Sequence, residues 1–156
     1  MNHVTFLRKA IELAEKNSTD GTSGPFGAII VRDGEIVGRG GNRVVEDRDP
    51  TAHAEILAIR DASERLGTHI LEGCTIYCSC EPCPMCLSAI YWAHIPQVVF
   101  AALGEEAKGA GFDDTFIKRE LGLAWPDRSI LAVRALPEEG ERVLRLWGKN
   151  PDRIEY

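Results

Sequence analysis

Apolar residues recur at regular spacings that predict secondary structure along most of the chain. Near the start, four of them lie three or four positions apart, as on one face of a helix: Val4, Leu7, Ile11 and Ala14. The polar run at residues 17–21 ends this helix. An apolar stretch at residues 26–31 predicts a strand, and Asp33-Gly34 predicts a tight turn into a second arm at residues 36–38.

After this hairpin, predicted helices and strands alternate. We expect helices at residues 52–66, 82–93 (opened by Pro82 or Pro84), 114–121 and 138–147, and strands at residues 75–79, 97–101 and 129–133. This order predicts an α/β fold in which a central mixed five-stranded sheet lies between two layers of helices, a three-layer α/β/α sandwich. Periodicity alone leaves the order of the strands open.

Composition favours one soluble domain spanning residues 1–156, because the chain is 44% apolar and 27% charged and shows no repeat or linker. The formal charge of −6 argues against a nucleic-acid partner and favours a small-molecule substrate. The chain has no apolar run near the roughly 20 residues that span a bilayer, and no signal-peptide pattern. We therefore expect no membrane partner and a cytoplasmic protein.

Two short motifs carry the chemistry: His53-Ala54-Glu55 and Pro82-Cys83-Pro84-Met85-Cys86. Together they offer one imidazole, two thiols and a carboxylate. Three such ligands with an open fourth position suit a catalytic zinc ion, one per chain. Each cysteine and the histidine is expected in the first turn of a helix, where the helix dipole favours thiolate over thiol. Glu55, which is left unliganded, can then carry protons.

Other interpretations of these residues remain open. His53 can be a helix cap with the cysteines as small core residues, and Glu55 can be a surface residue in a first helical turn. A structural zinc site with four cysteines is a further alternative: Cys78, Cys80, Cys83 and Cys86. It leaves the His-x-Glu motif unexplained. Cys74 has no partner in either arrangement, and we expect a buried thiol.

His-x-Glu with Pro-Cys-x-x-Cys is the signature of zinc-dependent nucleobase deaminases, and the chain resembles the cytidine-deaminase-like superfamily over most of its length. It looks most like the bacterial guanine deaminase branch in four segments: residues 51–55, 80–93, 111–116 and 155–156. Residues 23–28 and Asn42 match the wider group, which includes tRNA adenosine and cytosine deaminases. The segment from 121 to 150 matches weakly.

The resemblance implies a function and a role for each matching residue. The function is hydrolytic deamination of guanine to xanthine and ammonia in purine catabolism, by a homodimer. His53, Cys83 and Cys86 would hold zinc, and Glu55 would shuttle protons. The base would be bound by six residues: Phe26 and Trp92 near the ring, Asn42 and the Ala54 N–H as polar partners, and Asp114 and Tyr156 in the guanine-specific part. Asp114 is also a candidate second proton carrier, and the C-terminal tail is a candidate part of the site.

Asp114 has the chemistry that guanine requires. Guanine presents N1–H and a 2-amino group as a row of donors, which a carboxylate accepts, whereas adenine N1 and cytosine N3 are acceptors. Asp113 or Asp114 can instead cap a helix, Asn42 can be a turn residue, and Tyr156 at the chain end can be frayed. Deamination of guanosine, cytosine or tRNA adenosine stays open as an alternative, as does a non-catalytic zinc protein.

Overall fold

A computed structural model describes residues 2–21 and 23–155, with only the backbone at Asp20. The chain divides into two compact units, Met1–Asp114 and Thr115–Tyr156. Nine helices and strands form the first unit: α1 (His3–Asp20), β1 (Gly27–Arg32), β2 (Glu35–Gly41), α2 (Val44–Asp47), α3 (Ala54–Leu66), β3 (Cys74–Cys80), α4 (Pro84–Trp92), β4 (Gln97–Ala102) and α5 (Gly104–Gly109).

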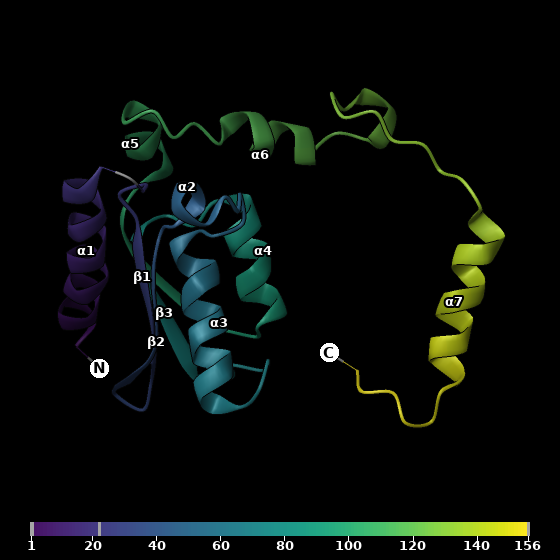
Figure 1. Cartoon of the computed structure of the whole chain (residues 1–156), viewed down its shortest axis with the longest axis horizontal. Helices are drawn as coiled ribbons and strands as arrows, with labels where there is room; N and C mark the ends of the chain where they lie inside the picture. The colour runs from purple at the N-terminus through teal and green to yellow at the C-terminus, as the bar shows by residue number, and fades with distance from the viewer. Residues whose placement is uncertain (1, 22, 156) are drawn as a thin grey trace. The chain divides into compact units, whose positions relative to one another are not determined.

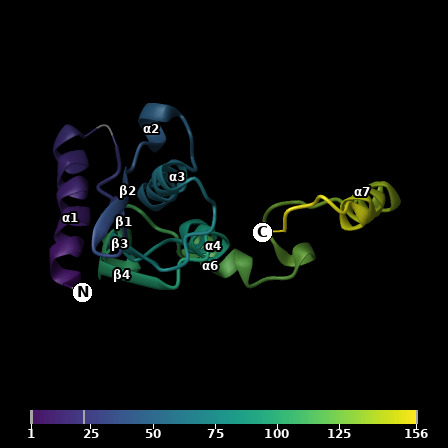
Figure 2. The ribbon, with the colours of Figure 1, turned by 90° about the horizontal axis from the view of Figure 1, so that it is seen from below.

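The sheet of the first unit is mixed, as predicted. Its strand order is β2-β1-β3-β4, with β1 antiparallel to both β2 and β3 and with β4 parallel to β3. Helix α1 covers one face, and α3 and α4 cover the other (Figures 1 and 2). This arrangement confirms the three-layer α/β/α architecture.

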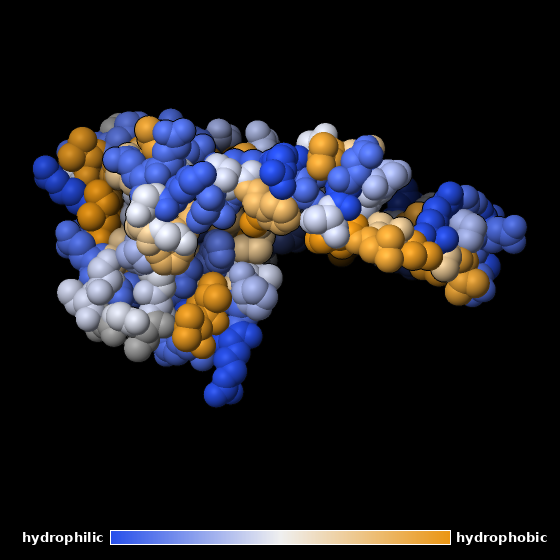
Figure 3. All heavy atoms as spheres, turned by 90° about the horizontal axis from the view of Figure 1, so that it is seen from above, coloured by the Kyte–Doolittle hydropathy of each residue, from blue (hydrophilic) through white to orange (hydrophobic). Residues whose placement is uncertain are grey.

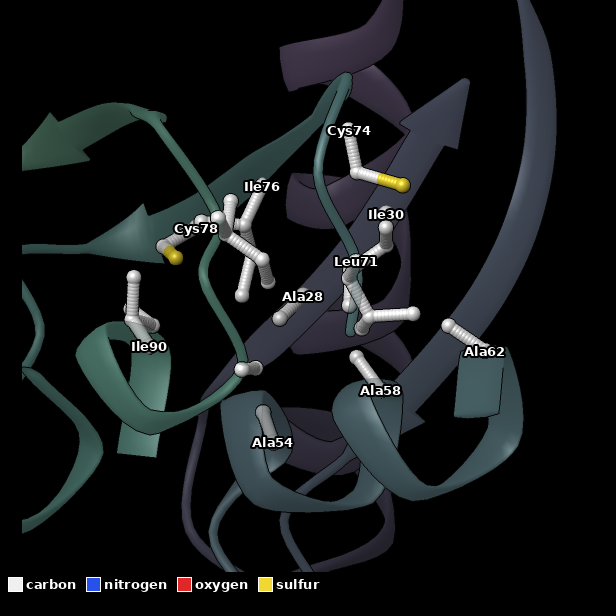
Figure 4. Close-up of a cluster of buried hydrophobic side chains, with 12 residues drawn as sticks. Ala28, Ile30, Ala54, Ala58, Ala62, Leu71, Cys74, Ile76, Cys78 and Ile90 are labelled. Carbon is white, nitrogen blue, oxygen red and sulfur yellow. The ribbon is translucent and has the colours of Figure 1, made fainter. Parts of the chain in front are cut away.

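The central strands are buried on both faces, which explains their nearly continuous apolar sequence. Along β1, Ala28 and Ile30 point into a core shared with α3 and α4, whereas Ile29 and Val31 pack toward α1. Figure 4 shows the larger of these two cores, where residues of β1 and β3 meet α3 and Ile90 of α4.

Helix α3 lies unusually close to β2 because small residues face each other. A Cβ atom at Gly38 would overlap the backbone oxygen of Ala58, and one at Gly40 would overlap the backbone oxygen of Ala54. Alanines at positions 54, 58 and 62 line the facing side of the helix, and all three are buried. The glycines therefore fix the first turn of α3 against the end of the strand.

Turn chemistry at the helix and hairpin ends follows the sequence. Asp33 and Gly34 both have positive φ, 52° and 83°, as a tight hairpin requires. Gly67 ends α3 in the left-handed conformation with φ of 65°. Helix α3 begins at Ala54, two residues later than predicted, because the 49–52 segment forms hydrogen-bonded turns instead. The short helices α2 and α5 were not predicted.

The prediction of a fifth strand at residues 129–133 is wrong, because these residues form neither a strand nor a helix and the sheet formed by the described residues has four strands. They lie in the second unit, where Ile130, Leu131 and Val133 are 73%, 88% and 80% exposed. An apolar run forms a strand only when a strand edge pairs with its backbone, and none of the described residues does so.

The second unit contains α6 (Thr115–Leu121), the short helix η1 (Trp125–Asp127) and α7 (Pro137–Lys149). Helices α6 and α7 were predicted within one to two residues at each end. None of the described residues of this unit is buried, and hydrophobic side chains lie on its surface (Figure 3). No helix among the described residues combines the length and the apolar character needed to cross a membrane.

Candidate functional site: a zinc centre at two helix ends

The starts of α3 and α4 bring the two sequence motifs together. His53 is the N-cap residue of α3 and Cys83 is the N-cap residue of α4, both with extended backbone. Pro84 takes the first helical position after Cys83, where a missing N–H costs nothing. Cys86 lies within the same first turn, so both sulfurs face His53. The distances from His53 Nδ1 to Cys83 Sγ and Cys86 Sγ are 3.6 and 3.5 Å.

These three side chains fit a zinc ion. Their ligand atoms all lie within 4.8 Å of one another. Tetrahedral zinc with typical bonds of about 2.3 Å to sulfur and 2.0 Å to nitrogen separates the two ligand atoms by about 3.6 Å, which is the distance found. Cys86 is buried and the other two are half-buried. Three protein ligands leave a fourth position, as in catalytic zinc sites.

Electrostatics at the site favour a thiolate at Cys83. Hydrogen bonding from the Cys86 side chain lowers the pKa of Cys83 to about 4, against its burial, and His53 adds to the effect. The same hydrogen bond, with burial, raises the pKa of the Cys86 thiol. The hydrogen bond between the two sulfurs therefore leaves Cys83 as the more acidic of the two thiols. A hydrogen bond with Cys83 likewise raises the pKa of His53.

Glu55 is buried beside these ligands. It lies in the first turn of α3, its side chain is hydrogen-bonded with Cys86, and the residue is only 8% exposed. Burial raises the pKa of its carboxyl group, since removal from water disfavours the charged form. The interpretation of Glu55 as a surface residue is therefore wrong. A buried carboxyl beside a metal centre has the position of a proton carrier.

The four-cysteine alternative does not form. Of the described His, Cys, Asp and Glu residues, those that gather closely enough for an ion are His53, Cys83 and Cys86. Cys78 lies in the hydrophobic core with its thiol pKa raised by burial, and Cys80 Sγ lies 3.6 Å from the Leu103 oxygen. Cys74 is a buried thiol, as predicted.

Asn42 lies next to the start of α3. The neighbouring Arg43 N–H donates to the Ala52 oxygen at 3.0 Å, directly before His53. Asn42 itself is 6% exposed, and its Oδ1 accepts hydrogen bonds from Gly24 N–H at 3.3 Å and Val44 N–H at 3.2 Å. Ala54 begins α3, so no preceding helical turn offers its N–H a carbonyl partner. Both residues can thus present donors near the metal ligands.

Phe26 and Asp114 lie in the same unit. The Phe26 ring packs edge-on against Phe112 with centroids 4.8 Å apart, a contact that the sequence pattern did not indicate. Asp114 is half-buried and directly precedes α6. The pKa of Cys80 is raised by burial first, and then by the charges of Glu55 and Asp114 among others. The charges of Glu55 and Asp114 therefore both raise the pKa of the Cys80 thiol.

Two expected base-binding residues have different positions. Trp92 ends α4, about 13 Å along the helix axis from Cys83 at 1.5 Å per residue, and is 64% exposed. The structure thus does not bring Trp92 beside the metal ligands of its own chain. Tyr156 lies outside the described residues.

Comparisons with known proteins agree with this site. The family model of the cytidine and deoxycytidylate deaminase zinc-binding region matches residues 1–102. Guanine deaminase of Bacillus subtilis is 46% identical over the full length of both chains. A tRNA-specific adenosine deaminase of Aquifex aeolicus is also 46% identical, over 67% of this chain and 68% of its own.

Solved structures lead to the same family. The X-ray structure of guanine deaminase from Bacillus subtilis matches with a TM-score of 0.96, covering 100% of this chain and 99% of that one. Guanine deaminase from Nitrosomonas europaea matches with a TM-score of 0.65 at 34% identity, over 70% and 63% of the two chains. The chain therefore belongs to the cytidine and deoxycytidylate deaminase family of zinc-binding proteins, in the branch that contains the bacterial guanine deaminases.

Proposed function

We propose that this protein catalyses the zinc-dependent hydrolytic deamination of guanine to xanthine and ammonia, a step of purine breakdown. The observation that carries the proposal is the full-length similarity to a guanine deaminase, since the tRNA-specific relative of equal identity covers only two thirds of the chain. The similarity to the guanine deaminase includes Asp114, because it covers the whole chain.

His53, Cys83 and Cys86 hold the zinc ion in this proposal, as their spacing and chemistry support. When bound, zinc acts as a Lewis acid that makes water nucleophilic near neutral pH. The protein supplies the proton transfers. A Glu55 carboxylate oxygen takes one proton from the attacking water and passes it to N3, the ring nitrogen beside C2 that carries no hydrogen, while the water oxygen bonds to C2. Glu55 then takes the second water proton from the hydroxyl group on C2 and delivers it to the 2-amino group. The bond from C2 to that group breaks as the C2 carbonyl forms, because ammonia leaves where an amide anion does not.

The base is held by partners of opposite hydrogen-bonding character. In this proposal Asp114 accepts from the donor edge of guanine, formed by N1–H and the 2-amino group, and assists the second proton transfer. Asn42 and the Ala54 N–H donate to acceptor atoms of the purine. Phe26 packs near the ring, supported by Phe112. Trp92 and Tyr156 complete the set of proposed base-binding residues.

The protein is proposed to be a cytoplasmic homodimer that takes a free base and binds no nucleic acid. The formal charge of −6 supports the last point. The second unit supports the dimer: its described residues include no buried one, yet α7 exposes Val143, Leu144, Leu146 and Trp147. An exposed apolar surface of this kind marks a protein–protein contact, and in this proposal a second copy of the chain packs against it. A neighbouring chain can then complete the site through Tyr156 or Trp92.

A substrate panel tests the assignment. Purified protein is incubated with guanine, guanosine, cytosine and adenine, and turnover is followed by ultraviolet absorbance together with ammonia release. We expect kcat/KM for guanine to exceed the values for cytosine and adenine by at least about a hundredfold, because the site bonds a donor edge that these two bases lack. Guanosine shares that edge, so equal turnover of guanosine would move the assignment to the nucleoside. Activity on adenine or cytosine alone would refute it.

A further inference from the structure

Asn42 presents a defined hydrogen-bonding face. Its Oδ1 accepts from Gly24 N–H and Val44 N–H, at 3.3 and 3.2 Å. Backbone N–H groups only donate, so these two bonds fix the oxygen end of the amide. The Nδ2 group lies on the other side of the amide carbon and is a donor only. Asn42 therefore suits an acceptor atom of a purine and would not suit a donor.

Asn17 holds this arrangement from outside the site. It lies near the end of α1, and its Nδ2 donates to the Asn42 backbone oxygen at 2.8 Å and to the Gly24 backbone oxygen at 3.3 Å. One amide thus connects the residue that carries the base-binding side chain to the loop residue that bonds its Oδ1. These bonds span 25 and 7 positions of sequence.

The surroundings of Asn17 leave little freedom in this connection. Two glycines lie close to the two amides. If Gly41 carried a Cβ atom, it would lie 3.2 Å from the Asn17 Nδ2 and Oδ1 atoms, and a Cβ atom at Gly24 would lie 3.3 Å from Asn42 Cγ. The Asn42 N–H is tied to the Phe26 oxygen at 3.1 Å, and the Phe26 N–H to the Gly24 oxygen at 2.8 Å. The network therefore links Asn17 to both Asn42 and Phe26.

We propose that Asn17 is a positioning residue for base binding, which acts through Asn42. It holds Asn42 so that the Nδ2 group of Asn42 points at an acceptor atom of the purine ring. This role rests on the proposed function, because it requires Asn42 to bind the base. Asn17 does not touch the base in this account. Its loss weakens substrate binding and leaves the zinc ligands and Glu55 in place.

Four proteins test the role: Asn17→Ala, Asn42→Ala, the double variant and the control Ser18→Ala. Alanine is a strong helix former, so Asn17→Ala should keep α1 folded. Ser18 is the next residue of the helix, and its hydroxyl donates within that helix, to the Ala14 oxygen at 3.0 Å. We measure KM and kcat for guanine, zinc content and thermal unfolding for each protein.

The expected result is a rise in KM of about tenfold for Asn17→Ala, comparable to the loss of one hydrogen bond, with kcat changed less than threefold. The double variant should be no worse than Asn42→Ala, because Asn17 acts only through Asn42. Zinc content should stay at one per chain, and Ser18→Ala should match the parent protein. If Asn17 had a purely structural role, Asn17→Ala would lower the unfolding temperature and would not raise KM selectively over kcat.

Asn17→Asp separates donation from shape, since it has the same size but no N–H group, and it should also raise KM. The proposal is overturned if both Asn17 variants keep KM within twofold of the parent. It is equally overturned if the losses of Asn17→Ala and Asn42→Ala multiply in the double variant. A parent protein that does not deaminate guanine refutes the proposed function, a result distinct from either of these.

Discussion

At the scale of single residues, the expected site residues differ strongly in burial. Glu55 is 8% exposed and next to Cys86, whereas Trp92 is 64% exposed at the far end of α4. Sequence spacing predicted His53, Cys83 and Cys86 correctly as one group, because residues at the N-terminal ends of two helices converge when those ends meet. It gave no sign of Asn17, whose bonds join residues that are distant along the chain.

Replacement of Glu55 by glutamine should leave zinc bound and lower kcat by at least about a thousandfold, because the amide occupies the same space and cannot accept the water proton. Zinc content by metal analysis and kcat for guanine are measured on the same sample. Glu64→Gln, at an exposed position of the same helix, is the matched control. A zinc-loaded Glu55→Gln protein with ordinary turnover would remove the role of Glu55.

Asp114→Asn should reduce kcat/KM for guanine by about a hundredfold or more, because the variant replaces one acceptor oxygen with a donor that faces the donor edge of the base. The adjacent Asp113→Asn serves as the control, since Asp113 pairs with Lys108 at 3.2 Å. Steady-state kinetics decide the question. If Asp113→Asn lowered kcat/KM for guanine as much as Asp114→Asn does, the loss would come from disturbance of the loop that contains both residues, and a role of Asp114 in base recognition would be contradicted.

At the scale of elements, close packing of α3 on β2 sets the position of the site. Residue patterns predicted most helices and strands, since apolar periodicity reflects which faces are buried. They failed where the length of an element or the pairing of a strand decides the structure. Helix α2 is a single turn of four residues, which is too short to show a helical period. Residues 129–133 have the composition of a strand, and composition does not reveal whether a partner edge is at hand.

Gly40→Ala should destabilise the protein by about 1–3 kcal/mol, because the added methyl group meets the Ala54 backbone oxygen and pushes the start of α3 away. The same displacement should weaken zinc binding, since His53 moves with the helix. Gly109→Ala is the control, as open space surrounds that position. Denaturant unfolding and a zinc competition assay provide the measurements. An unchanged stability for Gly40→Ala would contradict the packing account.

At the scale of the whole molecule, the two units differ in how they are stabilised. The first has two buried cores, whereas no described residue of the second is buried. A 42-residue segment is close to the size of roughly 40 residues below which domains usually need disulfides, metals or oligomerisation to fold. Sequence patterns identified α7 as a helix, but they could not show that none of the described residues of its unit would be buried.

If a second copy covers this surface, the protein should be a dimer in solution, and Leu144→Asp combined with Trp147→Asp should convert it to monomers with reduced activity. Arg142→Glu, a polar position on the same helix, is the control. Light scattering coupled to gel filtration gives the mass of each protein. A fully active monomeric parent protein would contradict the dimer and the sharing of Tyr156 or Trp92 between chains.

The central claim is that zinc at His53, Cys83 and Cys86 enables the chain to deaminate guanine, and metal removal and return test it most directly. Protein treated with a chelator and dialysed should lose ammonia release from guanine, and zinc should restore it in full at one equivalent per chain. A plot of rate against zinc bound should be linear up to that point. Guanine turnover that persists without metal, or that zinc at one equivalent does not restore, would contradict the account.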